Sequence, residues 1–359
     1  MPPADRCRIM KKRLSSLFRS SLLFLLVLPL NHCFDLVAQQ RFRPAIEGDY
    51  PHSVLIVTNR VINTTEAGGI VFTNKVDTTR GLKFYKVSFE NDEWDGVEYD
   101  NFNDLLENQA PYHDWAVWVH GDGQSFLLSM KRALEIQYLH KINLIVFSWP
   151  TKAADKGPVD NFKNSLANAG LTVPHLGEMC RILQDYRETD GNRMEHENLS
   201  IFFHSLGNYL LKLTIEAGAF QQISPGLFDN LVINSAATDS EGHHQWTEKL
   251  GLQKRIYIIY NGGDKNLRGL RVLTSYGMQL GEYPLPPYAG NAIYIDFSVA
   301  VGRRFSAGAT HSFYYARVPE RSQKIRQFYT DIFHGREIDP DDPERFDTLI
   351  DHKIFMIRF

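Results

Sequence analysis

Short apolar runs alternate with amphipathic stretches along the chain from about residue 51 onward. Runs such as Ala116–His120 and Asn143–Trp149 are apolar at successive positions, which is typical of strands buried on both faces of a parallel sheet. Ser125–Leu139 instead carries apolar residues at helical spacing. The other expected strands are Val54–Thr58, Leu82–Phe89, Leu199–Phe203, Leu231–Ser235, Arg255–Tyr260 and Ala292–Asp296. The other expected helices are Val173–Tyr186, Leu206–Ala217, Gln245–Leu250, Lys265–Tyr276 and Glu320–Phe333.

This alternation predicts an α/β fold, a three-layer α/β/α sandwich with a mostly parallel central sheet. We assign one domain to residues 51–334, in which the polar stretch 151–198 is an insertion that partly covers a site. A linker over residues 39–50 precedes the domain, and a tail over 335–359 follows it. Ligands of such sheets bind at the carboxyl ends of the strands, so we look for chemistry just after each strand.

Composition narrows the class of protein. The 359 residues are 43% hydrophobic and 23% charged, which is ordinary for a globular enzyme and excludes a collagen-like or largely disordered chain. The net charge of −3 gives no reason to expect a nucleic-acid partner. No phosphate-loop or dinucleotide motif is present, so we expect no organic cofactor. The pair His243-His244 lacks further ligands at zinc spacing, so we expect no metal.

The N-terminal residues have the pattern of a secretory signal peptide. Six Lys and Arg residues lie between Arg6 and Arg19, and the apolar run Leu22–Leu30 follows them. That run is shorter than the roughly 20 residues that a membrane-spanning helix needs. A signal peptide over residues 1–38, ending at Ala38, is therefore expected. The chain would be exported to the periplasm or outside the cell, without a stable membrane span after cleavage; a lipoprotein or membrane anchor is the alternative.

The three cysteines are too few for a disulfide framework, so the fold must depend on a hydrophobic core. Removing residues 1–38 would also remove Cys7 and Cys33. The remaining Cys180 lies in an expected helix, where we interpret it as a small buried apolar residue.

One expected strand runs directly into a serine. Ile201-Phe202-Phe203 leads into His204-Ser205-Leu206-Gly207-Asn208, and a helix follows. Strand, serine, tight turn and helix form the setting of a nucleophile elbow, which lifts the Ser205 hydroxyl clear of the sheet. The next backbone N–H, that of Leu206, then lies at a helix N-terminus, where an anion is favoured. The alternative is that Ser205 only caps the helix.

Two later strand ends supply possible partners for Ser205. Asp264 follows the strand Arg255–Tyr260, and His311 follows the last expected strand. The order Ser205, Asp264, His311 is that of a Ser–Asp–His triad in α/β-hydrolases, in which the carboxylate orients the histidine. Asp239, after the preceding strand, is the competing carboxylate.

An earlier strand end supplies the second donor of an oxyanion hole. The N–H of Leu206 and the N–H of Asp122 are the expected donors, with Gly123 as the alternative to Asp122. The Asp122 carboxylate would oppose the developing negative charge unless it points away. His120 could serve as a general base, but a structural loop histidine is the interpretation that we favour. The expected pocket residues are His120, Gly121, Gly123, Ser148, Trp149 and His204.

These segments resemble the α/β-hydrolase family of unknown function called DUF900, from Val54 to about Phe333. The resemblance rests on Val57-Thr58-Asn59-Arg60, Val119-His120-Gly121, Phe147-Ser148-Trp149-Pro150, His204-Ser205-Leu206-Gly207-Asn208, Asn261-Gly262-Gly263-Asp264 and Gly308-Ala309-Thr310-His311-Ser312. It implies a single α/β-hydrolase domain and a serine triad at the residues assigned above, but it implies no substrate.

We therefore expect a secreted serine hydrolase that cleaves an ester or thioester bond through an acyl-enzyme. Its expected substrate is a small-molecule or lipid-like acyl compound, and the oligomeric state stays open. A non-catalytic α/β-hydrolase fold that binds a partner at the cell envelope is the main alternative. Phe203 and Asp122 support it, because a small residue is expected at the place of Phe203 before the serine and because the Asp122 carboxylate opposes an oxyanion. An acyltransferase, in which an alcohol replaces water, is the other alternative.

Overall fold

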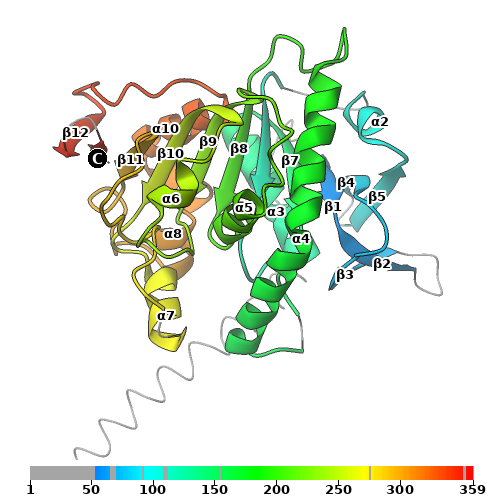
Figure 1. Ribbon diagram of the computed structural model, residues 1–359, viewed down its shortest axis with the longest axis horizontal. Coiled ribbons are helices and arrows are strands. Elements are labelled where there is room, and N and C mark those ends of the chain that lie inside the picture. The colour runs from blue at the N-terminus through cyan, green and yellow to red at the C-terminus, as the bar shows by residue number, and fades with distance from the viewer. Residues whose placement is uncertain are drawn as a thin grey trace, which may run out of the picture. The chain divides into compact units, whose positions relative to one another are not determined.

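A computed structural model describes residues 53–64, 70–90, 93–107, 112–153, 155–274, 276–350 and 353–358. Its main feature is an eleven-stranded sheet with the strand order β12-β13-β11-β10-β9-β8-β6-β7-β1-β4-β5 (Figure 1). The strands are β1 Ser53–Thr58, β4 Lys83–Glu90, β5 Glu93–Tyr99, β6 Trp115–Val119, β7 Asn143–Ser148, β8 Leu199–His204, β9 Phe228–Asn234, β10 Gln253–Tyr260, β11 Ala292–Asp296, β12 Phe346–Ile350 and β13 Ile354–Ile357.

The sheet is parallel through its centre and antiparallel only at its two edges. Every neighbouring pair from β13 through β11, β10, β9, β8, β6 and β7 to β1 is parallel. Strands β4 and β5 add antiparallel pairs at one edge, and β12 adds one at the other. The carboxyl ends of the central strands therefore open on one side of the sheet.

Helices cover both faces of this sheet. Helices α3 (Phe126–His140) and α10 (Gln323–Phe333) pack on one face and on each other. Helices α4 (Pro158–Arg187) and α5 (Gly207–Glu216), with α6 (His244–Thr247) against α5, cover the other (Figure 1). The short helices are α2 Phe102–Glu107, α7 Lys265–Thr274, α8 Ala307–His311 and α9 Arg317–Arg321. The expected three-layer α/β architecture with a mostly parallel sheet is confirmed.

The continuous apolar runs of the sequence fold as doubly buried strands. All residues of β6, β7, β8 and β9 are buried. Successive side chains of a strand pack on opposite faces of the sheet. Phe203 packs in the core beneath α4 and α5, whereas the Phe202 ring stacks on Phe333 of α10. This two-sided burial explains why the runs show no polar alternation.

The chain changes direction across the sheet between β6 and β8. After β6, helix α3 leads along one face to β7, and α4 then leads along the opposite face to β8 on the other side of β6. Such a reversal opens a crevice at the carboxyl ends of the two strands, where α/β proteins bind ligands. The loop after β6 and the turn after β8 meet at this point.

Three segments differ from the sequence-based expectations. The Thr- and Asn-rich stretch after β1 forms a second, two-stranded sheet from β2 (Arg60–Thr64) and β3 (Ile70–Val76). Within the expected insertion 151–198, α4 is far longer than the helix Val173–Tyr186. The expected tail 335–359 is not separate from the domain, because β13 pairs with β11 and β12 pairs with β13.

The expected signal peptide over residues 1–38 and the linker over 39–50 lie outside the described residues. Among the helices in the described part of the chain, none combines the length and the apolar character needed to cross a membrane.

Candidate active site

Ser205 lies in a sharp turn between β8 and α5, as the sequence predicts. Its φ is +53°, a left-handed conformation that costs a non-glycine residue about 1–3 kcal/mol. The Asn208 side chain stabilises the turn, because its Nδ2 donates to the carbonyl oxygens of Phe203, Ser205 and Asn234 at 3.1–3.2 Å. Close packing adds to this, since a Cβ on Gly207 would lie 2.7 Å from the carbonyl oxygen of Val119.

The loop after β6 approaches Ser205 directly. A Cβ built on Gly121 would lie 2.6 Å from Ser205 Cβ and 3.1 Å from Ser205 Oγ. Only a residue without a side chain fits this approach. The two strand ends that the sequence assigned to the nucleophile and to the oxyanion hole therefore come together.

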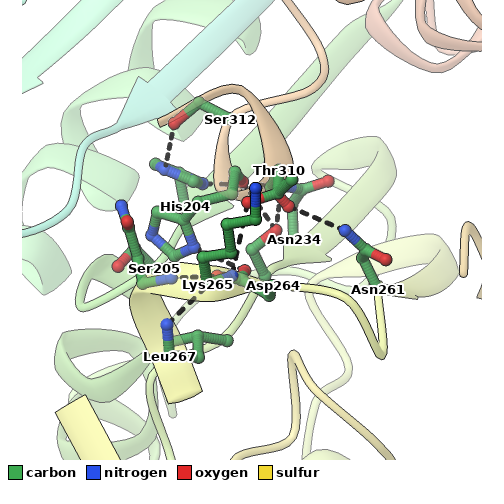
Figure 2. A network of polar contacts seen from close by, with 12 residues as sticks. His204, Ser205, Asn234, Asn261, Asp264, Lys265, Leu267, Thr310 and Ser312 are labelled. Atoms are coloured by element: carbon green, nitrogen blue, oxygen red, sulfur yellow. Dashed lines mark hydrogen bonds and ion pairs between the residues drawn. The ribbon is translucent and has the colours of Figure 1, made fainter. Parts of the chain in front are cut away.

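Asp264 and His311 form a hydrogen-bonded pair. His311 Nδ1 lies 2.6 Å from Asp264 Oδ2. The other carboxylate oxygen accepts the backbone N–H groups of Asn266 and Leu267 at 2.9 and 3.0 Å, so Asp264 also caps α7 (Figure 2). Asp264 is fully buried and His311 is 7% exposed. The carboxylate is thus fixed against the imidazole in a geometry that suits a general base and its orienting acid.

Side-chain hydrogen bonds from Asn261 and Ser235 hold the end of helix α8, which carries His311. Asn261 Nδ2 donates to the carbonyl oxygen of Thr310 at 2.9 Å (Figure 2). Ser235 Oγ donates to the carbonyl oxygen of His311 at 2.8 Å. The sequence motif contains Asn261, but its role in holding this helix end is visible only in the fold. Asp239, the competing carboxylate, is exposed and forms a β-bridge with Gln279.

No hydrogen bond joins Ser205 Oγ to His311 within the described part of the chain. The ring of His204 instead lies 4.7 Å from that of His311, centroid to centroid, and His204 Nε2 lies 3.1 Å from Ser312 Oγ (Figure 2). Burial, reinforced by the nearby His311, holds the pKa of His204 well below its usual range. His204 is therefore a neutral, buried side chain beside the Asp264–His311 pair.

The expected oxyanion donors are both available. Among the described residues, the backbone N–H groups of Leu206 and Asp122 make no hydrogen bond. The Asp122 carboxylate is directed to α4, where Oδ1 accepts from Ser165 Oγ at 2.6 Å and from Asn161 Nδ2 at 3.1 Å. Burial raises the pKa of this carboxyl, although these hydrogen bonds oppose the shift. The carboxylate therefore has partners on α4.

The structure contradicts the prediction that three of the expected residues line the substrate pocket. His120, Ser148 and Trp149 are all fully buried, so they cannot line a surface open to substrate. His120 Nε2 accepts the Trp149 backbone N–H at 3.3 Å, and the Trp149 indole donates to the His120 carbonyl oxygen at 2.9 Å. Burial lowers the pKa of His120 to about 3. These contacts support the structural interpretation of His120 over that of a general base.

Sequence reasoning missed the role of Arg60, whose side chain supports the loop after β6 through buried hydrogen bonds. The guanidinium is fully buried, and burial lowers its pKa to about 9. It donates to the carbonyl oxygens of Trp149 and Gln124 and to Ser148 Oγ. It also binds the β2–β3 hairpin through the carbonyl oxygen of Thr73 and Oδ1 of Asn74. The motif contains Arg60, but only the fold shows its five acceptors.

A parallel sheet covered by helices, with a strained serine between a strand and a helix, is the architecture of the α/β hydrolases. Residues 98–285 match the family model DUF900, described as an alpha/beta hydrolase of unknown function. This match covers more than half of the 359 residues, and the chain belongs to that family. The match includes Ser205 and Asp264 and ends before His311. Membership supports a hydrolase-type function. No curated protein matches the chain.

Proposed function

We propose that this protein is a serine hydrolase that cleaves an ester or thioester bond. His311 takes the proton of Ser205, whose Oγ attacks the acyl carbonyl, and Asp264 holds His311 in the required tautomer. The N–H groups of Leu206 and Asp122 bind the oxyanion. Water then hydrolyses the acyl-enzyme. The proposal depends on one observation above all: a serine at φ +53° directly follows His204, whose ring lies 4.7 Å from the ring of His311, and His311 is joined to the buried Asp264 at 2.6 Å.

The position of Asp122 supports the oxyanion part of this proposal. Its carboxylate has partners on α4, at 2.6 Å from Ser165 Oγ. A hydrogen-bonded carboxylate facing α4 interferes less with the negative charge that develops near its own backbone N–H. The N–H of Leu206, the N-cap of α5, makes no hydrogen bond within the described part of the chain and supplies the other donor.

A fluorophosphonate probe tests the nucleophile. We expect the probe to label Ser205 in the full-length protein, and Ser205→Ala to abolish labelling. His311→Gln should slow the labelling rate by about a thousandfold or more, because the general base is lost. Ser312 is the matched control, because its hydroxyl lies 3.1 Å from His204 and could itself be mistaken for the nucleophile. Ser312→Ala should be labelled like the wild type; labelling that follows Ser312 instead would refute the assignment.

A non-catalytic binding function is the second candidate, and one observation favours it. No hydrogen bond links Ser205 Oγ to His311 among the described residues, whereas an active triad needs that contact during the reaction. Catalytic hydrogen bonds often form only with substrate bound. Hydrolysis of p-nitrophenyl acyl esters that Ser205→Ala abolishes would exclude this candidate, and the absence of both hydrolysis and labelling would establish it over ours.

We also propose that the chain is exported. The basic residues before Leu22–Leu30 and the short apolar run itself support a cleavable signal peptide. N-terminal sequencing of the protein from the culture medium or periplasm should give a chain that begins at Gln39. A chain that keeps its first residues and stays in the cytoplasm would contradict export.

A further inference from the structure

Several exposed apolar side chains lie on segments that follow the carboxyl ends of the parallel strands. Leu127 begins α3 after β6, Val159 begins α4 after β7, and Val299 follows β11. The end of α7, which follows β10, adds Val272, which is 78% exposed, and Leu273, which is 50% exposed. All of these segments follow the carboxyl ends of strands in the same parallel sheet. Val272 and Leu273 are adjacent in the chain, and neighbouring exposed apolar side chains favour an interaction surface.

Helix α7 joins this apolar character to positive charge. It carries Lys265, Arg268 and Arg271 and no acidic residue. The Lys265 ammonium donates to the carbonyl oxygen of Phe305 at 2.7 Å, in the turn that also holds the exposed residues Arg303 and Arg304. This end of the molecule is therefore locally basic in a chain whose net charge is −3.

One acidic group cancels part of this charge. Glu282 is buried, and one of its oxygens accepts from Arg271 at 3.2 Å. Lys265 and Arg268 are the two cations of α7 that form no ion pair with an acidic side chain among the described residues. Asp264 is buried at the other end of the helix, against His311. The exposed Asp239 lies near Gly277, beyond the end of the helix.

Helices α7 and α4 approach each other near the carboxyl ends of the parallel strands. The Tyr276 ring, just after α7, contacts the Phe162 ring near the start of α4, with 6.1 Å between centroids. The same part of α4 holds the Asp122 loop through Asn161 and Ser165. Figure 1 shows α7 and the beginning of α4 on the same side of the sheet. The segment just after α7 therefore contacts the part of α4 that holds the Asp122 loop.

We propose that the end of α7 docks this protein on a lipid bilayer with anionic headgroups, so that the active site takes its acyl substrate from membrane lipid. A basic helix with exposed apolar residues fits such a surface, because the side chains of Val272 and Leu273 enter the acyl boundary while the cations contact the headgroups. The substrate class rests on the proposed acyl hydrolase function, whereas docking itself needs no catalysis.

Vesicle sedimentation with full-length Ser205→Ala protein tests docking apart from catalysis. We expect binding to phosphatidylcholine vesicles that contain phosphatidylglycerol, weaker binding to phosphatidylcholine alone, and a decrease with added salt. Changing Val272→Ser and Leu273→Ser together should weaken binding about tenfold, because the inserted apolar area is lost. Arg268→Gln should weaken it about fivefold through the lost cation.

Val97 in β5 and Leu349 in β12 provide the matched control, since they are 50% and 49% exposed and lie on the edge strands of the sheet. Val97→Ser with Leu349→Ser should bind vesicles as the parent does. Equal binding by the parent and the Val272→Ser, Leu273→Ser protein, or equal binding to both kinds of vesicle, would overturn the proposal.

A local readout separates α7 from any other membrane-active segment of the chain. Brominated lipid should quench the fluorescence added by Leu273→Trp more strongly than that added by Leu349→Trp. Equal quenching at the two positions would refute docking through α7. Probe labelling of the wild type at Ser205 is measured separately, so failure of docking and failure of the proposed hydrolase function give different results.

Discussion

Ser205 depends on its neighbours for the backbone conformation that it holds. The strain of its left-handed φ, about 1–3 kcal/mol, is offset by contacts that exist only in this turn. Asn208 Nδ2 donates to three carbonyl oxygens, and the Ser205 carbonyl oxygen also accepts the N–H of Ala237 at 3.1 Å. These contacts therefore keep the Ser205 hydroxyl at the end of the strand, because without them the strained backbone would relax.

Gly121→Ala should inactivate the protein without unfolding it. The added methyl group would lie 2.6 Å from Ser205 Cβ, so either the loop after β6 or the turn that holds Ser205 must shift. We expect the probe-labelling rate to fall about a hundredfold, with a loss of about 1–3 kcal/mol in the free energy of unfolding. Labelling kinetics and urea unfolding measure the two effects.

Gly269→Ala is the control for this substitution. Gly269 lies in α7, where nothing is within 4 Å of an added Cβ. Alanine should raise the free energy of unfolding there by about 0.5–1 kcal/mol and leave labelling unchanged. If Gly121→Ala behaved like Gly269→Ala, the close approach to Ser205 would have no functional meaning.

Among the elements, the β2–β3 hairpin and the loop after β6 are joined through Arg60. One guanidinium connects the hairpin, through Thr73 and Asn74, with Gln124, Ser148 and Trp149. Trp149 in turn contacts His120 by two hydrogen bonds. The path from the hairpin to Gly121 is therefore continuous, which makes Arg60 a positioning residue for the proposed oxyanion hole.

Arg60→Lys should loosen that loop while keeping the charge. A lysine ammonium has three donors and cannot reproduce the planar array of guanidinium donors. We expect the free energy of unfolding to fall by about 1–3 kcal/mol, because buried acceptors lose their partners. Labelling at Ser205 should slow even at temperatures where the variant is fully folded. Arg181 forms an exposed ion pair with Asp185 on α4. Arg181→Lys should change the free energy of unfolding by no more than about 0.5 kcal/mol and should leave the labelling rate unchanged.

The pattern of apolar runs was enough to predict the central strands and the residues that follow them. The pattern located Ser205, Asp264 and His311 because each of them follows a strand that the sequence marks as buried by a continuous run of apolar residues. The hairpin β2–β3 was missed because Thr, Asn and Gly residues interrupt its short apolar runs. Helix α4 was predicted only over its second half, because residues 158–172 are mostly polar. In α4, Gly170, Pro174 and Gly177 also weaken the helical signal. The five acceptors of Arg60 lie on segments far apart in the chain, so no local pattern could have revealed them.

At the scale of the whole molecule, the last residues complete the sheet. Strand β13 covers the edge of β11, and its residues Ile354, Phe355 and Ile357 are buried. Phe355→Ala should lower the free energy of unfolding by about 3–5 kcal/mol, a large part of the 5–15 kcal/mol typical of a domain. Leu349→Ala, at an exposed site of β12, should lower it by less than about 1 kcal/mol. Urea unfolding of both variants checks this, and equal losses would contradict a structural role for β13.

Buried histidines make the whole fold sensitive to acid. His120 and His140 are fully buried, and burial lowers their pKa values to about 3 and about 4. His140 contacts Thr330 Oγ1 and the Tyr314 carbonyl oxygen through its two ring nitrogens. In the unfolded chain both histidines take up a proton near pH 6.5, whereas in the folded chain they stay neutral to much lower pH. Between these values the unfolded state binds more protons, so stability falls as the pH falls.

His140→Gln tests this dependence. Below about pH 6.5, each buried neutral histidine should lower the free energy of unfolding by about 1.4 kcal/mol per pH unit. The variant starts from lower stability at pH 7.5, but its curve of stability against pH should be flatter by that amount down to about pH 4. His113→Gln should keep the wild-type slope, because the His113 side chain is 95% exposed in the folded chain. Urea unfolding across this pH range measures the slopes, and parallel curves for His140→Gln and the wild type would show that acid acts through other groups.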